Sequence, residues 1–185
     1  MLPIITFIGW HDSGKTTLAV QVVRRLKERG YSVAVIKSTK ETGLLPDQEG
    51  TDTGSYRLAG ADAVTLIAPD QMVITCRNPK KNLFTLAHRF FADVDIVIGE
   101  GFKDAEKVAK IEVSRGGAPL RDLVSNVIAV ATDRDVSGDH IFRLDESENI
   151  AAFLEQKFIA AHRAHRKNLG LTNNLQGRIT MDSPF

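Results

Sequence analysis

Short apolar runs alternate along this chain with longer segments in which apolar residues recur at helical spacing. Uninterrupted apolar runs of strand length are typical of strands that are covered on both faces of a sheet. Such runs predict buried strands at residues 4–8, 32–36 and 95–99, and further strands are predicted at residues 110–113 and 127–131. Apolar positions of helical period predict helices on Leu18, Val22, Val23 and Leu26, on Leu83, Leu86, Ala87 and Phe90, and on Ile150, Phe153, Leu154 and Phe158. The alternation predicts an α/β fold in three layers, a mostly parallel sheet with helices on both faces, in which ligands bind at the carboxyl ends of strands.

Two segments interrupt this pattern. Residues 37–54 are polar and contain three glycines and a proline, which predicts a long loop. Residues 63–67 and 72–75 are apolar runs separated by a short turn that contains proline, and they predict an antiparallel hairpin. Farther along, Asp145 with Glu148 three residues later predicts the start of the last helix.

The chain becomes basic after residue 160, where residues 162–167 read His-Arg-Ala-His-Arg-Lys. We therefore predict one domain over residues 1–160, which carries the candidate site described below, and a separate tail over residues 161–185. Two interpretations of the tail stay open. It is either a frayed helix end with a loose terminus or a short hairpin that docks on a neighbouring subunit.

The composition narrows the classes of function. The 185 residues suit one domain with a full hydrophobic core, and the net charge of +1 gives no reason to expect a nucleic-acid partner. The one cysteine, Cys76, excludes an internal disulfide and a thiolate zinc cluster, and we expect it to be a half-buried hydrophobe. The apolar run at residues 4–8 lacks a basic leader and is shorter than the about 20 residues that cross a bilayer. We therefore expect a cytoplasmic protein with no membrane partner.

Residues 9–16 read Gly-Trp-His-Asp-Ser-Gly-Lys-Thr and match the phosphate-binding loop known as Walker A. A predicted strand precedes this loop and an amphipathic helix follows it. Glycines let the backbone turn its N–H groups toward phosphates, and the positive end of the helix adds to the attraction. Lys15 brings a mobile charge to the β- and γ-phosphates, and Thr16 offers a hydroxyl to Mg²⁺. The predicted nucleotide contacts are His11, Asp12, Ser13, Gly14, Lys15, Thr16 and Thr17, of which His11 is expected to fill the loop rather than act as a base.

A second acidic group is expected where the strand at residues 95–99 ends. Glu100 follows that strand and should reach the sheet edge at which the phosphate loop lies. Its carboxylate can hold Mg²⁺ through water or orient an attacking water, so we predict Lys15 and Glu100 as the catalytic pair. A solvated loop carboxylate is the alternative. The glycines on either side of Glu100 are expected to keep the site open, and Asp95, at the opposite end of the strand, is expected to be structural.

Residues 130–135 form another candidate site, again after a predicted strand. A carboxylate accepts two N–H donors from guanine but finds one such donor on adenine. GTP-binding proteins place that carboxylate in an Asn/Thr-Lys-x-Asp motif, of which Thr132 and Asp135 are present while Asp133 replaces the lysine. The partial match favours guanine over adenine, with an ordinary Asx turn as the alternative. Together the motifs predict GTP as the ligand or substrate and Mg²⁺ as the cofactor, and they identify residues 1–160 as a P-loop GTP-binding domain.

These motifs in combination resemble the molybdopterin-guanine dinucleotide biosynthesis protein B (MobB) family of P-loop NTPases, over residues 3–159. Beyond the phosphate loop, the resemblance rests on Lys37, on Asp-x-x-Gly-Thr-Asp-Thr at residues 47–53, on Ser-Tyr-Arg-Leu-Ala-Gly-Ala at residues 55–61, on Glu-Gly-Phe-Lys at residues 100–103, and on Ala-Lys-Ile at residues 109–111. Two positions depart from the family's usual residues. Ser38 stands where many members have His, and Thr51 stands where many have Lys.

The resemblance implies a GTP-binding adapter in molybdenum cofactor biosynthesis. Such proteins are homodimers with weak GTPase activity, and they assist the nucleotidyltransferase that joins GMP to molybdopterin to form molybdopterin guanine dinucleotide. The residues carried over as phosphate and Mg²⁺ contacts are Gly14, Lys15, Thr16 and Thr17. Glu100 is carried over as the acid near the metal and Asp52 as a second metal-side carboxylate, so the implied metal set is Thr16, Asp52 and Glu100.

Two alternatives on the same fold stay open. A small-molecule kinase would close an arginine-rich lid over the phosphates, whereas the arginines of this chain are scattered. A GTP-driven metallochaperone would carry a cluster of His or Cys, and His162 with His165 is the one close histidine pair. Lys37 and Lys40, after the second strand, are predicted to attract a phosphate-bearing ligand such as molybdopterin, with a solvated loop as the alternative.

Overall fold

The structure is a computed structural model that describes residues 1–42, 44, 50–77 and 82–168. The chain folds into two compact units. One is made of residues 1–38 together with the chain from residue 82 onward, and the other of residues 39–81. The hydrophobic pattern did not predict this division, because the second unit is an insertion between two elements of the first.

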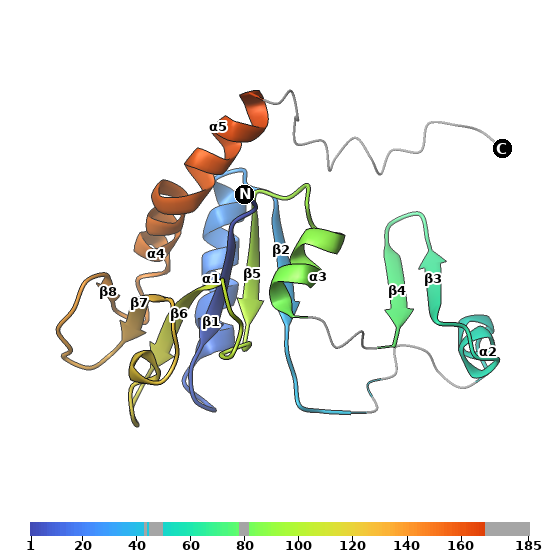
Figure 1. The fold of residues 1–185 in the computed structure, drawn as a ribbon, viewed down its shortest axis with the longest axis horizontal. Helices are drawn as coiled ribbons and strands as arrows, with labels where there is room; N and C mark the ends of the chain where they lie inside the picture. Colours follow the sequence, from blue (N-terminus) through green and yellow to red (C-terminus); the bar gives the residue numbers. More distant parts are fainter. Residues whose placement is uncertain (43, 45–49, 78–81, 169–185) are drawn as a thin grey trace. The chain divides into compact units, whose positions relative to one another are not determined.

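The first unit is built on a six-stranded sheet in which every pair of neighbouring strands is parallel. Its strand order is β2-β5-β1-β6-β7-β8 (Figure 1). The strands are β1 (Ile4–Ile8), β2 (Val33–Lys37), β5 (Ile96–Glu100), β6 (Ala109–Ser114), β7 (Val127–Thr132) and β8 (Ile141–Phe142). All residues of β1 are buried, as expected of a strand that is covered on both faces. The predicted parallel sheet is confirmed, and the short β8 adds to it.

Helices cover both faces of this sheet. They are α1 (Lys15–Glu28), α3 (Leu83–Phe90), α4 (Ser147–Leu154) and α5 (Ala160–Asn168), with the 3-10 turn η1 (Leu120–Asp122) and the π-helical turn η2 (Glu155–Ile159). Leu18 of α1 and Ile150 of α4 belong to one hydrophobic cluster with Ile98 of β5. Leu83 of α3 belongs to a second cluster with Val97. Because neighbouring residues of a strand point to opposite faces, the three-layer fold is confirmed.

The start of α4 differs from the sequence prediction. The helix begins at Ser147 and is preceded by Glu146, rather than being capped by Asp145. The Glu146 carboxylate accepts the Arg143 backbone N–H (2.6 Å) and the Asn149 side-chain amide (2.7 Å). Glu146 thus stands at the cap position without capping the helix through its side chain, and the predicted cap at Asp145 is wrong.

The basic segment after residue 160 continues as helix α5 to Asn168. His162 and Arg166 of this helix are buried, and Arg166 Nη1 donates to the Ala92 carbonyl oxygen (2.8 Å). A frayed helix end therefore does not describe residues 161–168, which pack on the first unit. The rest of the predicted tail, residues 169–185, lies outside the described residues.

The second unit contains one described helix and one hairpin. Helix α2 (Asp52–Leu58) begins inside the segment predicted as a loop, because the Thr51 side chain accepts the Gly54 N–H (3.2 Å) and caps the helix. Strands β3 (Ala63–Ile67) and β4 (Met72–Cys76) pair antiparallel as a separate two-stranded sheet, which confirms the predicted hairpin. Cys76 is exposed rather than half-buried, because most side chains of this small sheet face solvent.

Candidate functional site

The phosphate loop connects β1 to α1 in the first unit (Figure 1). Its first glycine, Gly9, has no room for a side chain, because a Cβ atom there would lie 2.3 Å from the Val113 carbonyl oxygen and 2.5 Å from Ser13 Oγ. Gly14 turns the chain into α1 with a φ of 90°, in the left-handed region that favours glycine. Packing therefore requires the first glycine of the motif, and the backbone angle favours the second.

Lys15 is the first residue of α1, and its side chain folds back over the loop. Its Nζ donates to the Trp10 carbonyl oxygen (2.6 Å) and to Ser13 Oγ (3.4 Å). Burial lowers the pKa of Lys15, and the Glu100 carboxylate opposes that shift. The ammonium group is thus held at the loop by neutral acceptors, which a phosphate oxygen can replace.

The sheet register brings Glu100 to this loop. Glu100 is the last residue of β5, opposite Phe7 of β1 on one side and Lys37 of β2 on the other. The preceding residue, Gly99, does not open the site as predicted, because a Cβ atom there would lie 2.8 Å from Leu83 Cδ2. The glycine instead lets α3 pack tightly on β5, and this packing fixes the position from which the Glu100 side chain emerges.

Side chains from α1, β5 and β2 meet beside the loop. Glu100 Oε1 accepts a hydrogen bond from Thr16 Oγ1 (2.6 Å) and forms an ion pair with Lys37 Nζ (3.1 Å). Lys37 Nζ also donates to Thr16 Oγ1 (3.4 Å). A hydroxyl and a carboxylate are the hard oxygen ligands that Mg²⁺ prefers, and water and nucleotide phosphates usually complete its coordination. The donor set of Thr16 and Glu100 therefore fits Mg²⁺.

The remaining loop positions are more exposed. His11 Nδ1 and Asp12 Oδ2 lie 2.7 Å apart, and both side chains are almost fully exposed. Asp12 adopts a φ of 57°, a left-handed conformation that Asp tolerates better than most residues. Thr17 is exposed in the first turn of α1. The nucleotide contacts predicted for these three residues stay predictions.

The candidate guanine-binding loop begins at the end of β7, which is separated from β1 by β6. Thr132 is buried, and its Oγ1 accepts the Arg134 backbone N–H (3.2 Å), so this side chain shapes the loop. Asp135 is fully exposed, with Arg143 Nη1 3.9 Å from its Oδ1. The Asp135 carboxylate is accessible to a base, and its role in base recognition stays a prediction.

Sequence reasoning missed a buried carboxylate, Glu112 of β6. Its two oxygens accept the backbone N–H groups of Leu120 (2.8 Å) and Arg121 (2.9 Å) at the start of η1. The available signal was an acidic residue inside an otherwise apolar strand. A small hollow beside it is lined by Glu112, Ser114, Gly117, Pro119, Arg121, Val130, Thr132, Arg134 and Val136.

Some residues of the predicted pattern do not belong to the first unit. Asp52 is the first residue of α2, and Lys40 belongs to the same second unit. Asp47 of the family pattern lies outside the described residues. The metal-side role of Asp52 and the phosphate-attracting role of Lys40 therefore stay predictions.

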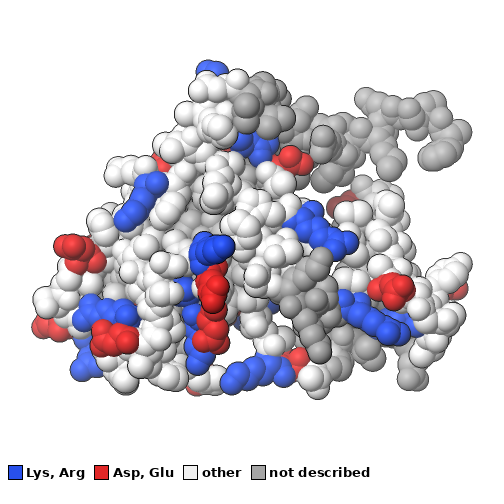
Figure 2. Space-filling model, viewed as in Figure 1, with Lys and Arg blue, Asp and Glu red and all other residues white. Residues whose placement is uncertain are grey.

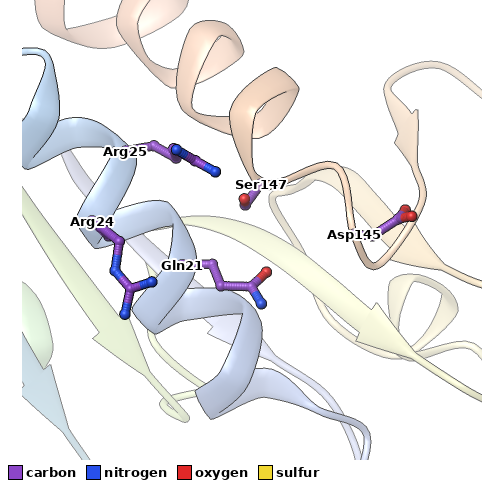
Figure 3. A pocket seen from close by; sticks show the side chains of 5 residues that line it. All are labelled: Gln21, Arg24, Arg25, Asp145 and Ser147. Atoms are coloured by element: carbon purple, nitrogen blue, oxygen red, sulfur yellow. The ribbon is translucent and has the colours of Figure 1, made fainter.

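Other surface features are separate from the predicted site residues. Figure 3 shows a pocket between α1 and the chain leading into α4, lined by Gln21, Arg24, Arg25, Asp145 and Ser147. Figure 2 shows basic and acidic side chains interspersed on the face in view.

Within the described residues, no group of three or more His, Cys, Asp or Glu side chains could hold a metal ion. No helix in that part of the chain is long and apolar enough to cross a membrane.

Comparisons with known proteins agree on one family. The family model described as Molybdopterin guanine dinucleotide synthesis protein B matches residues 4–133. The chain is 35% identical over 164 residues to the Molybdopterin-guanine dinucleotide biosynthesis adapter protein of Escherichia coli (strain K12), a match that covers 83% of this chain and 92% of that protein. It is 32% identical over 159 residues to the protein of the same name from Haemophilus influenzae (strain ATCC 51907 / DSM 11121 / KW20 / Rd), covering 83% and 88% of the two chains.

A solved structure supports the same assignment. The crystal structure of molybdopterin-guanine biosynthesis protein B (mobB) matches with a TM-score of 0.68 at 30% identity, covering 83% of this chain and 98% of that chain. The structure of Bacillus subtilis MobB, at 22% identity and a TM-score of 0.63, shares the fold. The match of the family model and the identity to the two relatives over most of their lengths establish that this chain belongs to the MobB family.

Proposed function

We propose that this chain is a GTP-binding adapter in molybdenum cofactor biosynthesis, which assists a nucleotidyltransferase in attaching GMP to molybdopterin. Its relatives from E. coli and H. influenzae carry the name of adapter proteins in molybdopterin-guanine dinucleotide biosynthesis, which supports the pathway. The observation that carries the nucleotide part is the 2.6 Å hydrogen bond between Thr16 Oγ1 and Glu100 Oε1. This bond joins two oxygen ligands suited to Mg²⁺ beside the loop that would hold the phosphates.

The loop offers several groups to a triphosphate. Phosphate oxygens would replace the Trp10 carbonyl as the partner of Lys15 Nζ, because charged acceptors form stronger hydrogen bonds than neutral ones. The backbone N–H groups at the start of α1 face the same anion. Thr16 and Glu100 would hold Mg²⁺, which when bound neutralises part of the phosphate charge. Weak GTP hydrolysis is part of the proposal, with Glu100 orienting a water molecule.

Lys37 offers a link to a second ligand. Its side chain is 55% exposed and reaches Glu100 Oε1 at 3.1 Å, so the ammonium group lies beside the proposed nucleotide site while still open to solvent. A lysine in this position can bind the phosphate group of molybdopterin as a point charge. The proposed pterin contact would place the two substrates of the transfer reaction near one another.

A homodimer is also part of the proposal, supported by the hairpin of the second unit. A two-stranded hairpin is marginally stable by itself, and exposed contiguous apolar side chains mark interaction surfaces. The exposed apolar side chains of this hairpin are Leu66, Ile67, Met72, Val73 and Ile74. Burial of these side chains against a second copy would stabilise the unit, and sedimentation of the purified chain at micromolar concentration tests the dimer.

The proposed adapter role is tested by reconstituting the transfer reaction. The nucleotidyltransferase, molybdopterin, GTP and Mg²⁺ are incubated with the wild-type chain, with Lys15→Ala, or with Arg24→Ala as a matched loss of one exposed positive charge on α1. Formation of molybdopterin guanine dinucleotide should be stimulated by the wild type and by Arg24→Ala but not by Lys15→Ala. Equal stimulation by Lys15→Ala would refute the nucleotide part of the proposal. Absence of stimulation by the wild type would refute the adapter role.

Guanine preference is tested separately by Asp135→Asn. This change replaces one oxygen of the exposed carboxylate with an NH2 group, so the side chain loses its negative charge and one acceptor while keeping its size. The ratio of GTP to ATP affinity, measured by calorimetry, should fall by about tenfold. An unchanged ratio would show that Asp135 does not read the base.

A further inference from the structure

The segment that follows β6 forms a second wall of the phosphate loop. β6 runs parallel to β1 in the sheet, so the two strands end at the same edge. Trp10 of the loop reaches this wall, where its Nε1 donates to the Ala118 carbonyl oxygen (2.8 Å). Its ring also lies close to Gly117, where a Cβ atom would be 3.5 Å from Trp10 Cδ1. The chain after β6 is therefore fixed against the loop.

Arg115 stands in this wall and lies against the loop. A Cβ atom at Gly14 would be 3.5 Å from Arg115 Nε, 3.6 Å from Nη2 and 3.8 Å from Cζ. The guanidinium group thus packs beside the glycine that leads into Lys15. Arg115 is exposed, and within the described residues it forms no hydrogen bond or ion pair with a carboxylate.

Other arginines of the first unit are used differently. Arg29 pairs with Glu148 at 2.6 Å, and Arg163 pairs with Asp95 at 2.8 Å. These two guanidinium groups join elements of the fold. Arg115 instead holds its charge next to a loop that is built to receive an anion, and no carboxylate of the described chain competes for it.

We propose that Arg115 binds the phosphates of the nucleotide, as a second cation beside Lys15 that the loop motif does not contain. The proposal rests on the GTP binding proposed above and adds a contact from outside the motif. A guanidinium group presents N–H donors in a planar fork that matches phosphate oxygens, whereas the Lys15 ammonium acts as a point charge. The sequence signal that could have found Arg115 is its position directly after a buried strand that ends at the same sheet edge as β1.

The test measures nucleotide affinity of the full-length chain and its variants in Mg²⁺. Arg115→Ala should weaken binding of GTP and GDP by about 10- to 100-fold, the range expected when a charged hydrogen bond is lost. Arg24→Ala removes an equal charge from an exposed position on α1 and should bind as the wild type does. Calorimetry gives the affinities, and the fluorescence of Trp10, the single tryptophan of the chain, gives a second readout from within the phosphate loop.

Two failures can be told apart. If the wild type binds neither GTP nor GDP, the proposed function fails and the role of Arg115 fails with it. If the wild type binds both nucleotides and Arg115→Ala binds them equally well, the phosphate-binding role of Arg115 is refuted and the proposed function stands. Arg115→Gln keeps most of the side-chain length without the charge, and it provides the same comparison should the alanine variant not fold.

Discussion

Strand β5 carries a carboxylate at each end, and the two are held in different ways. Asp95, just before the strand, is fully buried and receives donors from Ser32 N–H (2.8 Å), Ser32 Oγ (2.9 Å), Arg163 Nε (2.8 Å) and Arg163 Nη2 (2.9 Å). Glu100, at the other end, is 12% exposed and is held by the Thr16 hydroxyl and the Lys37 ammonium group. Fixed donors surround Asp95, whereas Glu100 has partners that can move.

This difference separates a structural carboxylate from one that is available to a ligand. Both oxygens of Asp95 are bonded to groups that β2 and α5 hold in place, so Asp95 fastens the C-terminal helix to the sheet. Glu100 can exchange the flexible Lys37 side chain for a cation without disturbing the core. Loss of a partner should therefore destabilise the fold at the Asp95 end of β5, whereas loss of the Glu100 charge should weaken nucleotide binding.

The largest effect is expected from Arg163→Ala, which removes the two Arg163 donors from the buried Asp95 carboxylate. Loss of one partner of a buried ion pair typically costs 3–5 kcal/mol, and because the Arg163 side chain is itself 43% exposed, we expect about 3 kcal/mol. The variant also loses the Arg163 contact over the Tyr31 ring, 4.4 Å from its centroid. Urea unfolding measures the change in the free energy of unfolding.

Two controls sharpen this prediction. Arg24→Ala, at an exposed position of α1, should change the free energy of unfolding by less than about 0.5 kcal/mol. Removal of the buried charge in the double variant Arg163→Ala with Asp95→Asn should recover part of the loss. A cost for Arg163→Ala no larger than that of Arg24→Ala would mean that Asp95 does not fasten α5.

A smaller effect, of a different kind, is expected from Glu100→Gln. The change removes the charge of a proposed metal ligand, so GTP affinity in Mg²⁺ should fall by about tenfold, or 1.4 kcal/mol. In EDTA the variant and the wild type should bind GTP with similar affinity. The free energy of unfolding should change by less than about 1 kcal/mol, because a partly exposed ion pair contributes little. Equal affinity of the two proteins in Mg²⁺ would remove Glu100 from the metal site.

The smallest effect concerns pH at the Asp95 end. His162 of α5 is buried, and neither of its ring nitrogens has a hydrogen-bond partner among the described residues. Burial lowers the pKa of His162, the Met1 ammonium group and Arg166 lower it further, and the nearby Val94 backbone and the Asp95 carboxylate oppose them. The folded chain therefore favours neutral His162. The stability that neutral His162 contributes should be complete above the pKa of about 6.5 that the residue has in the unfolded chain. It should be lost as the pH falls through the lower pKa of the folded chain.

The variant His162→Leu tests this pH dependence. It removes the titrating group while filling much of the same apolar space. Urea midpoints of the wild type should fall between pH 8 and pH 5 more steeply than those of His162→Leu. Identical pH profiles of the two proteins would show that His162 does not contribute.

The two ends of β5 also show what the sequence alone can predict. Glu100 was predicted because it follows an apolar run, and strand ends of a parallel sheet lie at one edge. The structural role of Asp95 was predicted, but its partner Arg163 was not, because the two lie 68 residues apart in the chain. Local composition indicated only a basic tail after residue 160, and the partners of its side chains come from distant elements.

Other differences have similar physical causes. Helix α2 was missed because Gly54 and Ser55 are weak helix formers, and the cap at Thr51 is a single side-chain contact. Gly99 was expected to open the site, whereas tertiary packing against Leu83 determines its role. The phosphate loop was predictable because its residues are contiguous, and its neighbour Arg115 was not because β6 brings it from elsewhere in the chain.

Calorimetric titration of the wild type and Lys15→Ala with GTP in Mg²⁺ tests the central claim, a triphosphate held by the loop between β1 and α1. The wild type should bind one GTP per chain, and Lys15→Ala should show no measurable binding, because the ammonium group facing the β- and γ-phosphates is lost. GTP affinity that is unchanged in Lys15→Ala, or a wild type that binds no GTP, would contradict the account.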